Sequence, residues 1–320
     1  MDFLHIMRNT AVQSRKIIAI GIGEDRDMNT RIYDVCHQII GQTSRSCVFW
    51  GKYSALAVMR KDFSPIVHKI EYLSLSSPED EILTIFWNQY SISTDDGTIM
   101  NKIDAIIRGG ISSSTFLKAL HQNTPKLTPS ISPDSDAGEV INADNPPLYR
   151  LALLETADQH QFFFAGVGID EINSLESKTT MIQLGLDFFR QMDWKPEIGI
   201  LSGGRLSDLG RDAQVDHTIK QAETLEKHFR KLNSTLSIKH YQILIEEAIR
   251  AKVNFIIAPD VISGNLIYRT LIHLGNGKSY GAVYLNIFHQ YHRVVIDCSR
   301  VAPRFEIEGA IYLAAALSED

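Results

Sequence analysis

The chain has 320 residues, of which 44% are hydrophobic and 22% charged, the ordinary composition of a globular protein. This apolar content excludes disorder as the main state. The length favours two domains, because single cores stop growing near roughly 250–300 residues. The formal net charge is −6, and Lys and Arg are scattered among Asp and Glu rather than gathered in a basic stripe. We therefore expect no nucleic-acid partner.

Location follows from hydrophobic patterning and cysteine usage. No apolar run approaches the roughly 18 residues that a membrane span needs. The first residues, MDFLHIMRNTAVQSRK, lack the long apolar region of a signal peptide. The chain has three cysteines, Cys36, Cys47 and Cys298, which are far apart in the sequence and form no CxxC motif, so we expect reduced, buried thiols. The sequence thus predicts a cytoplasmic protein without membrane contact.

Short apolar runs alternate with amphipathic stretches along the whole chain. The runs predict strands at 16–23, 47–50, 104–108, 150–155, 162–169, 197–202, 254–259, 280–286 and 293–297. Between them the apolar spacing predicts helices at 29–40, 78–88, 112–121, 178–192, 213–232, 240–251, 262–274 and 306–317. Continuously apolar strands are typical of sheets covered on both faces. We expect an α/β fold with a mainly parallel sheet and helices on both faces.

Residues 122–147 break this alternation, because they are rich in Pro, Ser, Asp and Asn and lack helical periodicity. Such a segment is typical of a long loop or a domain boundary. After it, the runs at 150–155 and 162–169 predict two strands joined by a tight polar turn.

The segment Ser202 to Arg211 follows an apolar strand and precedes a helix. It contains Gly203, Gly204 and Arg205, and glycines at a strand end let backbone N–H groups approach an anion, with the next helix adding its positive end. The alternative is an ordinary turn with exposed arginines. We favour a loop that binds an anion or a polar ligand.

Two further segments end predicted strands. Pro259-Asp260 with Gly264 and Asn265 opens a helix, and a ligand role and a purely structural role are evenly matched there. Asp297-Cys298-Ser299-Arg300 places a guanidinium after a buried strand, where it can bind phosphate with two parallel bonds. The alternative for Arg300 is a surface ion pair with Asp297.

A fourth glycine-bearing turn runs from Arg108 through Gly109 and Gly110 to Ser112. Its serines can offer donors to an anion, but helix capping and a plain turn explain them more simply. His289 and His292 have the spacing of a metal pair, yet no local cysteine or carboxylate completes a site. We expect no metal.

Together these segments resemble the phosphate acetyl/butyryltransferase family, which includes the phosphotransacetylases. The resemblance covers most of the chain in order: the Gly-Gly-Ile-Ser-Ser-Ser helix start, the strands at 150–155 and 162–169, Ile-Leu-Ser-Gly-Gly, Pro-Asp…Gly-Asn and Asp-x-Ser-Arg. The loop Ser-Gly-Gly-Arg-Leu-Ser-Asp-x-Gly-Arg is similar to a methanogen subgroup named after the methyltransferase-related protein MtxX, also called a methanogenesis marker protein.

This resemblance implies a fold like the isocitrate and isopropylmalate dehydrogenases, with a ligand cleft between two lobes. Residues 1–147 with 290–320 would form the first lobe, and residues 148–289 the second. Relatives commonly dimerise, so a homodimer is expected.

The resemblance also implies a site. Ser299 and Arg300 match the family's serine-arginine pair. Glu306 occupies roughly the place of the acid that acts as base toward the thiol of coenzyme A, as a Glu where the family uses Asp. The expected ligand-binding residues are Ser202, Gly203, Gly204, Arg205, Arg211, Asp260, Gly264, Asn265, Gly109, Gly110 and Ser112. The family's Ser/Thr-Lys-rich loop is replaced here by Gly-Gly-Arg, a departure that bears on coenzyme A and acyl-phosphate contacts.

Three functions fit these features. The first is an acyl- or phosphoryl-group transferase that binds a small anionic substrate such as phosphate or coenzyme A. The second is a methyltransferase or a partner of one, acting with a corrinoid or methyltransferase protein in coenzyme M metabolism. The third is a ligand-binding relative without turnover. We expect a transferase whose turns converge on one electropositive crevice.

Overall fold

The computed structural model describes residues 2–40, 46–63, 70–125, 147–168 and 171–318. Contacts divide the chain into two compact units. The central unit comprises Thr128–Ser279, and the terminal unit comprises Asp2–Leu127 with Tyr280–Asp320. The predicted lobe limits at 147 and 290 stay predictions as limits of folding domains, and the expected loop at 122–147 falls mostly on residues 126–146, outside the described part.

The terminal unit alternates strands and helices for most of its length. In chain order its elements are α1 (Phe3–Gln13), β1 (Ile17–Gly21), α2 (Arg26–Ile40), β2 (Ser46–Gly51), α3 (Tyr53–Asp62), β3 (Ile70–Ser74), α4 (Pro78–Asn88), β4 (Ile92–Ser93), β5 (Ile99–Met100), β6 (Ala105–Ile107), α5 (Ser113–Asn123), α10 (Leu285–Tyr291), β13 (Val294–Asp297) and α11 (Arg304–Leu317). The strands β13, β6, β1, β2 and β3 pair in this order and are all parallel. The carboxyl ends of these strands therefore meet at one edge.

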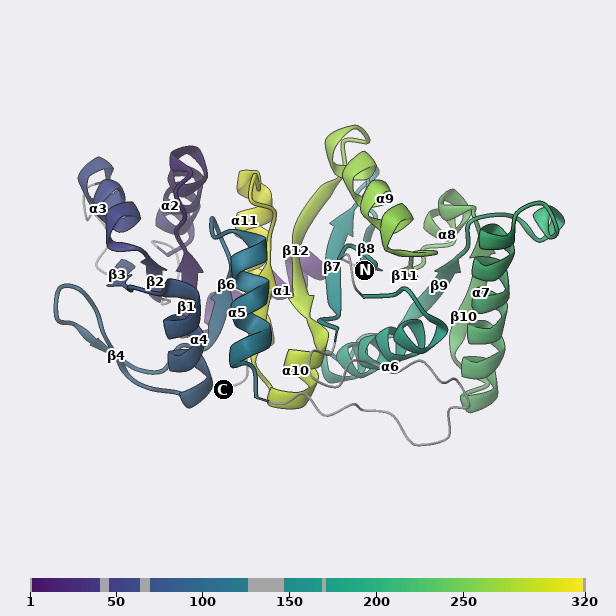
Figure 1. Ribbon diagram of the computed structural model, residues 1–320, viewed down its shortest axis with the longest axis horizontal. Coiled ribbons are helices and arrows are strands. Elements are labelled where there is room, and N and C mark those ends of the chain that lie inside the picture. Colours follow the sequence, from purple (N-terminus) through teal and green to yellow (C-terminus); the bar gives the residue numbers. More distant parts are fainter. Residues whose placement is uncertain (1, 41–45, 64–69, 126–146, 169–170, 319–320) are drawn as a thin grey trace. The chain divides into compact units, whose positions relative to one another are not determined.

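Helices cover both faces of the terminal sheet. The helix α11 packs on β13, β6 and β1 and also contacts α1 and α2. Figure 1 shows α4 and α5 in front of these strands, with α11 behind α5. Strand β12 (Lys278–Tyr284) pairs antiparallel with β13 and contains the boundary between the two units.

The central unit has a second set of parallel strands. Its elements are β7 (Arg150–Glu155), β8 (Gln161–Ala165), α6 (Leu175–Gln191), β9 (Glu197–Leu201), the 3₁₀ turn η1 (Leu206–Asp208), α7 (Ala213–Leu232), β10 (Ser237–Gln242), α8 (Ile245–Arg250), β11 (Phe255–Ile257) and α9 (Val261–His273). The order β10, β9, β11, β8 is parallel throughout, and β7 pairs antiparallel with β8. The expected mainly parallel α/β fold with helices on both faces is confirmed.

One predicted element is wrong. The helix expected over 240–251 is split, because Ser237–Gln242 forms β10 and only Ile245–Arg250 is helical. In β10 the buried and exposed side chains alternate, with Ile238 and His240 buried and Ser237 and Lys239 exposed. This period of two is typical of a strand with one covered face.

Membrane insertion finds no support in these helices. Among the residues that the structure describes, no helix combines the length and apolar character required to cross a bilayer.

The core of the central unit is rich in aromatic side chains. Rings contact one another in stacked and edge-on geometries between α6, β8, β11 and the turn after α6, and they comprise Phe163, Phe188, Phe189, Trp194 and Phe255. The helix α6 approaches β11 closely at Gly185, where an added Cβ would lie 2.3 Å from the Phe255 ring. Glycine at this position therefore sets the distance between helix and sheet.

Gly185→Ala is expected to destabilise the protein by about 2 kcal/mol, because the ring it meets lies in a packed core. Chemical denaturation measures this change. Gln183→Ala, an exposed position on the same helix, is the control and should stay within about 0.5 kcal/mol of wild type. Equal stability of the two variants would contradict the packing described here.

Candidate functional site

A buried arginine joins two turns at the carboxyl edge of the terminal sheet. Arg108 follows β6 and is 4% exposed. Its Nε lies 2.5 Å from Asp297 Oδ1, its Nη1 donates to the Ile111 carbonyl at 2.5 Å, and its Nη2 donates to the Cys298 carbonyl. Burial acts to lower the pKa of Arg108, but the charge of Asp297, its hydrogen bond and the neighbouring Cys298 and Tyr284 together raise it. The turns after β6 and β13 are thus fixed to each other.

Glu306 lies beneath the second of these turns, in the first turn of α11. Its side chain is 1% exposed, and Oε1 accepts a hydrogen bond from the Ser299 N–H at 2.6 Å. Burial raises the pKa of Glu306 to about 7, while the Ser299 N–H acts in the opposite direction. A carboxyl that titrates near neutrality can both accept and donate a proton. Among the predicted catalytic residues, the structure brings together Glu306 and Ser299.

Arg300 is exposed, and within the described part of the chain it forms no hydrogen bond or ion pair. The surface pair with Asp297 that the sequence allowed is not formed, because Asp297 binds Arg108. The guanidinium of Arg300 therefore remains available to an anion. The adjacent Cys298 is buried, and burial raises its pKa to about 12, so its thiol stays protonated at neutral pH.

The glycines after β6 are required by backbone packing. Gly109 has φ +60°, and an added Cβ would lie 2.2 Å from the Gly21 carbonyl oxygen. The Gly110 N–H donates to the same oxygen at 2.8 Å. These residues hold two strand ends together, and the Gly110 N–H is already engaged.

Ser112 precedes α5 without capping it through its side chain. Its hydroxyl instead lies 2.9 Å from Ser114 Oγ, and the serines that follow it, Ser113 and Ser114, are exposed. This turn therefore presents hydroxyl groups at the same edge as Ser299, since β6 and β13 are parallel neighbours.

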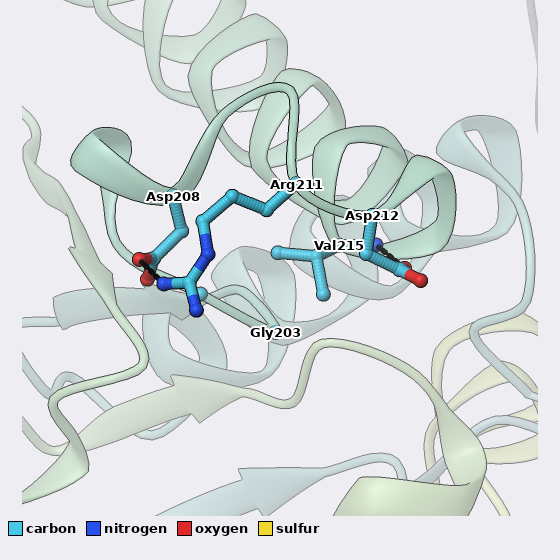
Figure 2. A pocket seen from close by; sticks show the side chains of 6 residues that line it. Gly203, Asp208, Arg211, Asp212 and Val215 are labelled. Atoms are coloured by element: carbon cyan, nitrogen blue, oxygen red, sulfur yellow. Dashed lines mark hydrogen bonds and ion pairs between the residues drawn. The ribbon is translucent and has the colours of Figure 1, made fainter.

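In the central unit, the loop after β9 borders a cavity of about 310 Å³. Figure 2 shows its lining, with the Arg211 guanidinium directed at the Asp208 carboxylate. The residues that line it are Gly203, Gly204, Asp208, Arg211, Asp212 and Val215. Of the predicted ligand residues, this cavity therefore collects three, the two glycines and Arg211.

The polar groups of this cavity already have partners. Arg211 pairs with Asp208 at 2.7 Å, Asp212 accepts from the N–H groups of Gln214 and Val215, and the Gly203 N–H donates to Thr218 Oγ1 at 2.8 Å. The first turn of α7 is thus capped by a carboxylate. Two aspartates face one arginine, so this lining is not electropositive by itself.

Ser202 and Arg205 lie outside that lining. Ser202 is fully buried, its hydroxyl donates to the Gly204 carbonyl at 2.9 Å, and His240 Nε2 lies 2.8 Å away. Because the serine proton is used by the carbonyl, His240 must donate to Ser202. Arg205 is exposed, and its backbone N–H bonds Asp208, which lowers the pKa of that carboxyl together with Arg211.

The segment after β11 fixes the start of α9. Asp260 caps the helix by accepting from the Ser263 N–H at 2.8 Å. At Gly264 an added Cβ would lie 2.3 Å from the Gly166 carbonyl oxygen, and Asn265 Nδ2 donates to the Val167 carbonyl at 3.0 Å. All three predicted residues thus have structural roles at the carboxyl edge of the central sheet.

Sequence reasoning missed Lys178 at this edge. Its side chain is 3% exposed, and Nζ donates to Gln221 Oε1 at 2.6 Å and to the Pro259 carbonyl at 2.5 Å. Burial lowers its pKa to about 8, although the Asp260 charge acts to raise it. The available signal was helical spacing, since Lys178 shares a face with the apolar Met181 and Ile182.

The predicted residues thus fall into two groups. Arg205 and Arg211 belong to the central unit, whereas Ser299, Arg300 and Glu306 belong to the terminal unit. Their convergence on one crevice stays a prediction. Among the described residues, no three His, Cys, Asp or Glu side chains are grouped to hold a metal ion.

Glu306→Gln is expected to stabilise the protein by about 2 kcal/mol more at pH 8 than at pH 5. The folded-state pKa of about 7 lies above the ordinary 4.5, so ionisation costs wild-type stability as pH rises between these values. Glutamine does not ionise and still accepts the Ser299 N–H. Thermal unfolding across pH measures the difference. Glu308→Gln on the same helix is the control, and a pH-independent effect of Glu306→Gln would contradict the assignment.

Known proteins provide the remaining comparison. No family model matches the chain. It is 36% identical over 263 residues to a protein from Methanosarcina barkeri named "Putative methyltransferase mtx subunit X", covering 82% of each chain. A protein of the same name from Methanosarcina mazei is 42% identical over 223 residues, covering 70% of each.

Solved structures show the fold. A phosphotransacetylase from Streptococcus pyogenes superposes with a TM-score of 0.63 at 16% identity, covering 98% of this chain and 97% of that one. A branched-chain phosphotransacylase from Enterococcus faecalis gives 0.60 at 12% identity, covering 95% and 100%. The resemblance noted from the sequence is therefore confirmed: the fold is of the phosphotransacetylase type, and the chain belongs to the family of mtx subunit X proteins.

Proposed function

We propose that this protein is a phosphotransacetylase-like transferase that binds a phosphate- or coenzyme A-like anionic ligand. The observation that carries this proposal is the buried Glu306 carboxyl, which has a pKa of about 7 and accepts from the Ser299 N–H beside the unpaired Arg300. The expected cleft between the lobes is the place proposed for the ligand.

In this proposal Arg300 binds the phosphoryl group of an acyl phosphate through parallel N–H donors. Glu306 accepts the proton of a thiol, and the thiolate attacks the acyl carbon. The bond between the acyl carbon and the phosphate oxygen breaks, so that the products are a thioester and inorganic phosphate. Arg300 neutralises the charge that builds up on the leaving phosphate.

A second candidate rests on the names of the relatives. Two of them are called subunits of a methyltransferase, which supports a role beside a methyl-transfer protein, with a corrinoid protein as partner. Capture of a purified corrinoid protein by the immobilised chain would favour this role. Tight binding of a ligand without any turnover would instead identify this protein as a ligand-binding relative that has no enzymatic activity.

We also propose that the chain forms a homodimer, with a second copy of itself as partner.

Arg300→Ala is expected to lower the rate of acyl exchange between acetyl phosphate and coenzyme A by about 10²–10³-fold. The same variant should lose the stabilisation that phosphate gives wild type, since a ligand raises stability only by binding the native state. Its thermal midpoint without ligand should stay at the wild-type value, because Arg300 is exposed and forms no hydrogen bond or ion pair with the residues that the structure describes.

Arg304→Ala is the matched control, an exposed arginine four residues away that pairs with Asp34 at 2.8 Å. It should retain exchange. Wild-type rates in Arg300→Ala, or no stabilisation of wild type by phosphate, acetyl phosphate or coenzyme A, would contradict the proposed function.

A further inference from the structure

Lys178 is a buried cation that forms no direct ion pair with the residues that the structure describes. Its 3%-exposed side chain leaves α6 and ends between α7 and the loop after β11. Among the described residues no carboxylate lies within ion-pair distance of Nζ, and both acceptors, Gln221 Oε1 and the Pro259 carbonyl, are neutral. Taking an ammonium from water is strongly unfavourable unless opposite charge and hydrogen bonds compensate the lost hydration. Two neutral oxygens supply only part of that compensation.

The groups around the lysine also have other hydrogen-bond partners. Asp260, whose charge acts on Lys178, uses Oδ1 to cap α9 through Ser263. Gln221 directs its amide nitrogen at His217 Nε2 at 2.9 Å. An ammonium has three N–H donors, and the described contacts use two of them. One donor therefore remains without an acceptor among the described residues.

The position of Lys178 is one where ligands gather in parallel α/β sheets, outside the carboxyl ends of the strands. Pro259 and Asp260 follow β11, and the neighbouring β9 ends at the loop that contains Gly203. The Gly203 N–H bonds Thr218, which lies on α7 three residues before Gln221. The lysine thus contacts the turn after β11 at Pro259, and it contacts α7, the helix that binds the loop after β9 through Thr218.

We propose that Lys178 recognises the anionic group of the ligand at the carboxyl edge of the central unit, and that this group is a tetrahedral oxyanion such as a phosphoryl group. The inference rests on the proposed function, which requires a phosphate-bearing ligand. The charge that attracts the ligand then belongs to the buried Lys178 rather than to the exposed arginines of the loop after β9. Arg211 is already paired with Asp208, whereas Lys178 is not.

A simple structural role would predict something different. An apolar side chain of similar length fills the same space without a desolvation cost, and replacing buried charges in this way is often neutral or stabilising. A lysine retained only for packing would therefore leave anion binding unchanged when it is replaced. Replacing a lysine that recognises an anion would weaken anion binding.

The test measures sulfate binding by calorimetry at pH 7.5 and pH 9.5, because sulfate keeps its double charge across this range. Arginines also stay charged, while the pKa of Lys178 is about 8. Wild type should bind sulfate on the order of tenfold more weakly at pH 9.5. Lys178→Met should bind weakly at both pH values. Lys220→Met, at an exposed lysine of α7, should behave as wild type.

Wild-type affinity in Lys178→Met at pH 7.5, or a wild-type affinity that does not change with pH, would overturn the assignment of Lys178. If sulfate binding then depended on Arg300 alone, the proposed function would stand without this inference. Absence of sulfate and phosphate binding by wild type would overturn both. Should Lys178→Met not fold, Lys178→Arg replaces it: because arginine stays charged at pH 9.5, this variant should lose the pH dependence of sulfate binding, and an unchanged pH dependence would overturn the assignment.

Discussion

The contact between Arg108 and Asp297 is the interaction on which the site of the terminal unit depends. One guanidinium satisfies a carboxylate and two backbone carbonyls from two different turns. Its partners lie up to 190 residues away in the sequence, so the ends of β6 and β13 are fixed relative to each other. Removing one member of such a buried pair leaves an uncompensated charge, which is strongly destabilising. The geometry of Ser299 above Glu306 follows from this arrangement.

Burial sets the chemistry of both proposed functional groups. Glu306 is an acid whose pKa is raised to about 7, and Lys178 is a base whose pKa is lowered to about 8. Desolvation is the main cause in each case, because it disfavours the charged form of either group. The two side chains therefore lie close to their midpoints at neutral pH, where proton exchange and charge recognition both respond to a bound ligand. Perturbed groups of this kind cluster at functional sites.

The sequence predicted the architecture well where the local signal was strong. Continuous apolar runs located β1, β9 and β13, and the segment that begins at Pro259 opened a helix as expected. The helix expected over 240–251 was wrong because a strand with one covered face extends to Gln242 and only Ile245–Arg250 is helical. The sequence could not predict which atoms Gly109 and Gly264 approach, since these carbonyl oxygens come from distant segments. No local motif marks the packing of two backbones.

The candidate site was predicted unevenly for the same reason. Ser299, Arg300 and Glu306 lie within eight residues, so one short sequence motif was enough to predict them. Arg108 was visible only as part of a glycine turn, and its partners are long-range. Lys178 stands alone on a helix, and only the fold shows that its ammonium is buried without an anion.

The most direct test of the account is an NMR titration of the Glu306 side-chain carboxyl in the ligand-free protein, assigned with Glu306→Gln. The account predicts a midpoint near pH 7, as burial beside Asp297 requires. A midpoint near the ordinary 4.5 would show that this carboxyl is fully ionised at neutral pH, and it would contradict the role of Glu306 as the group that exchanges a proton.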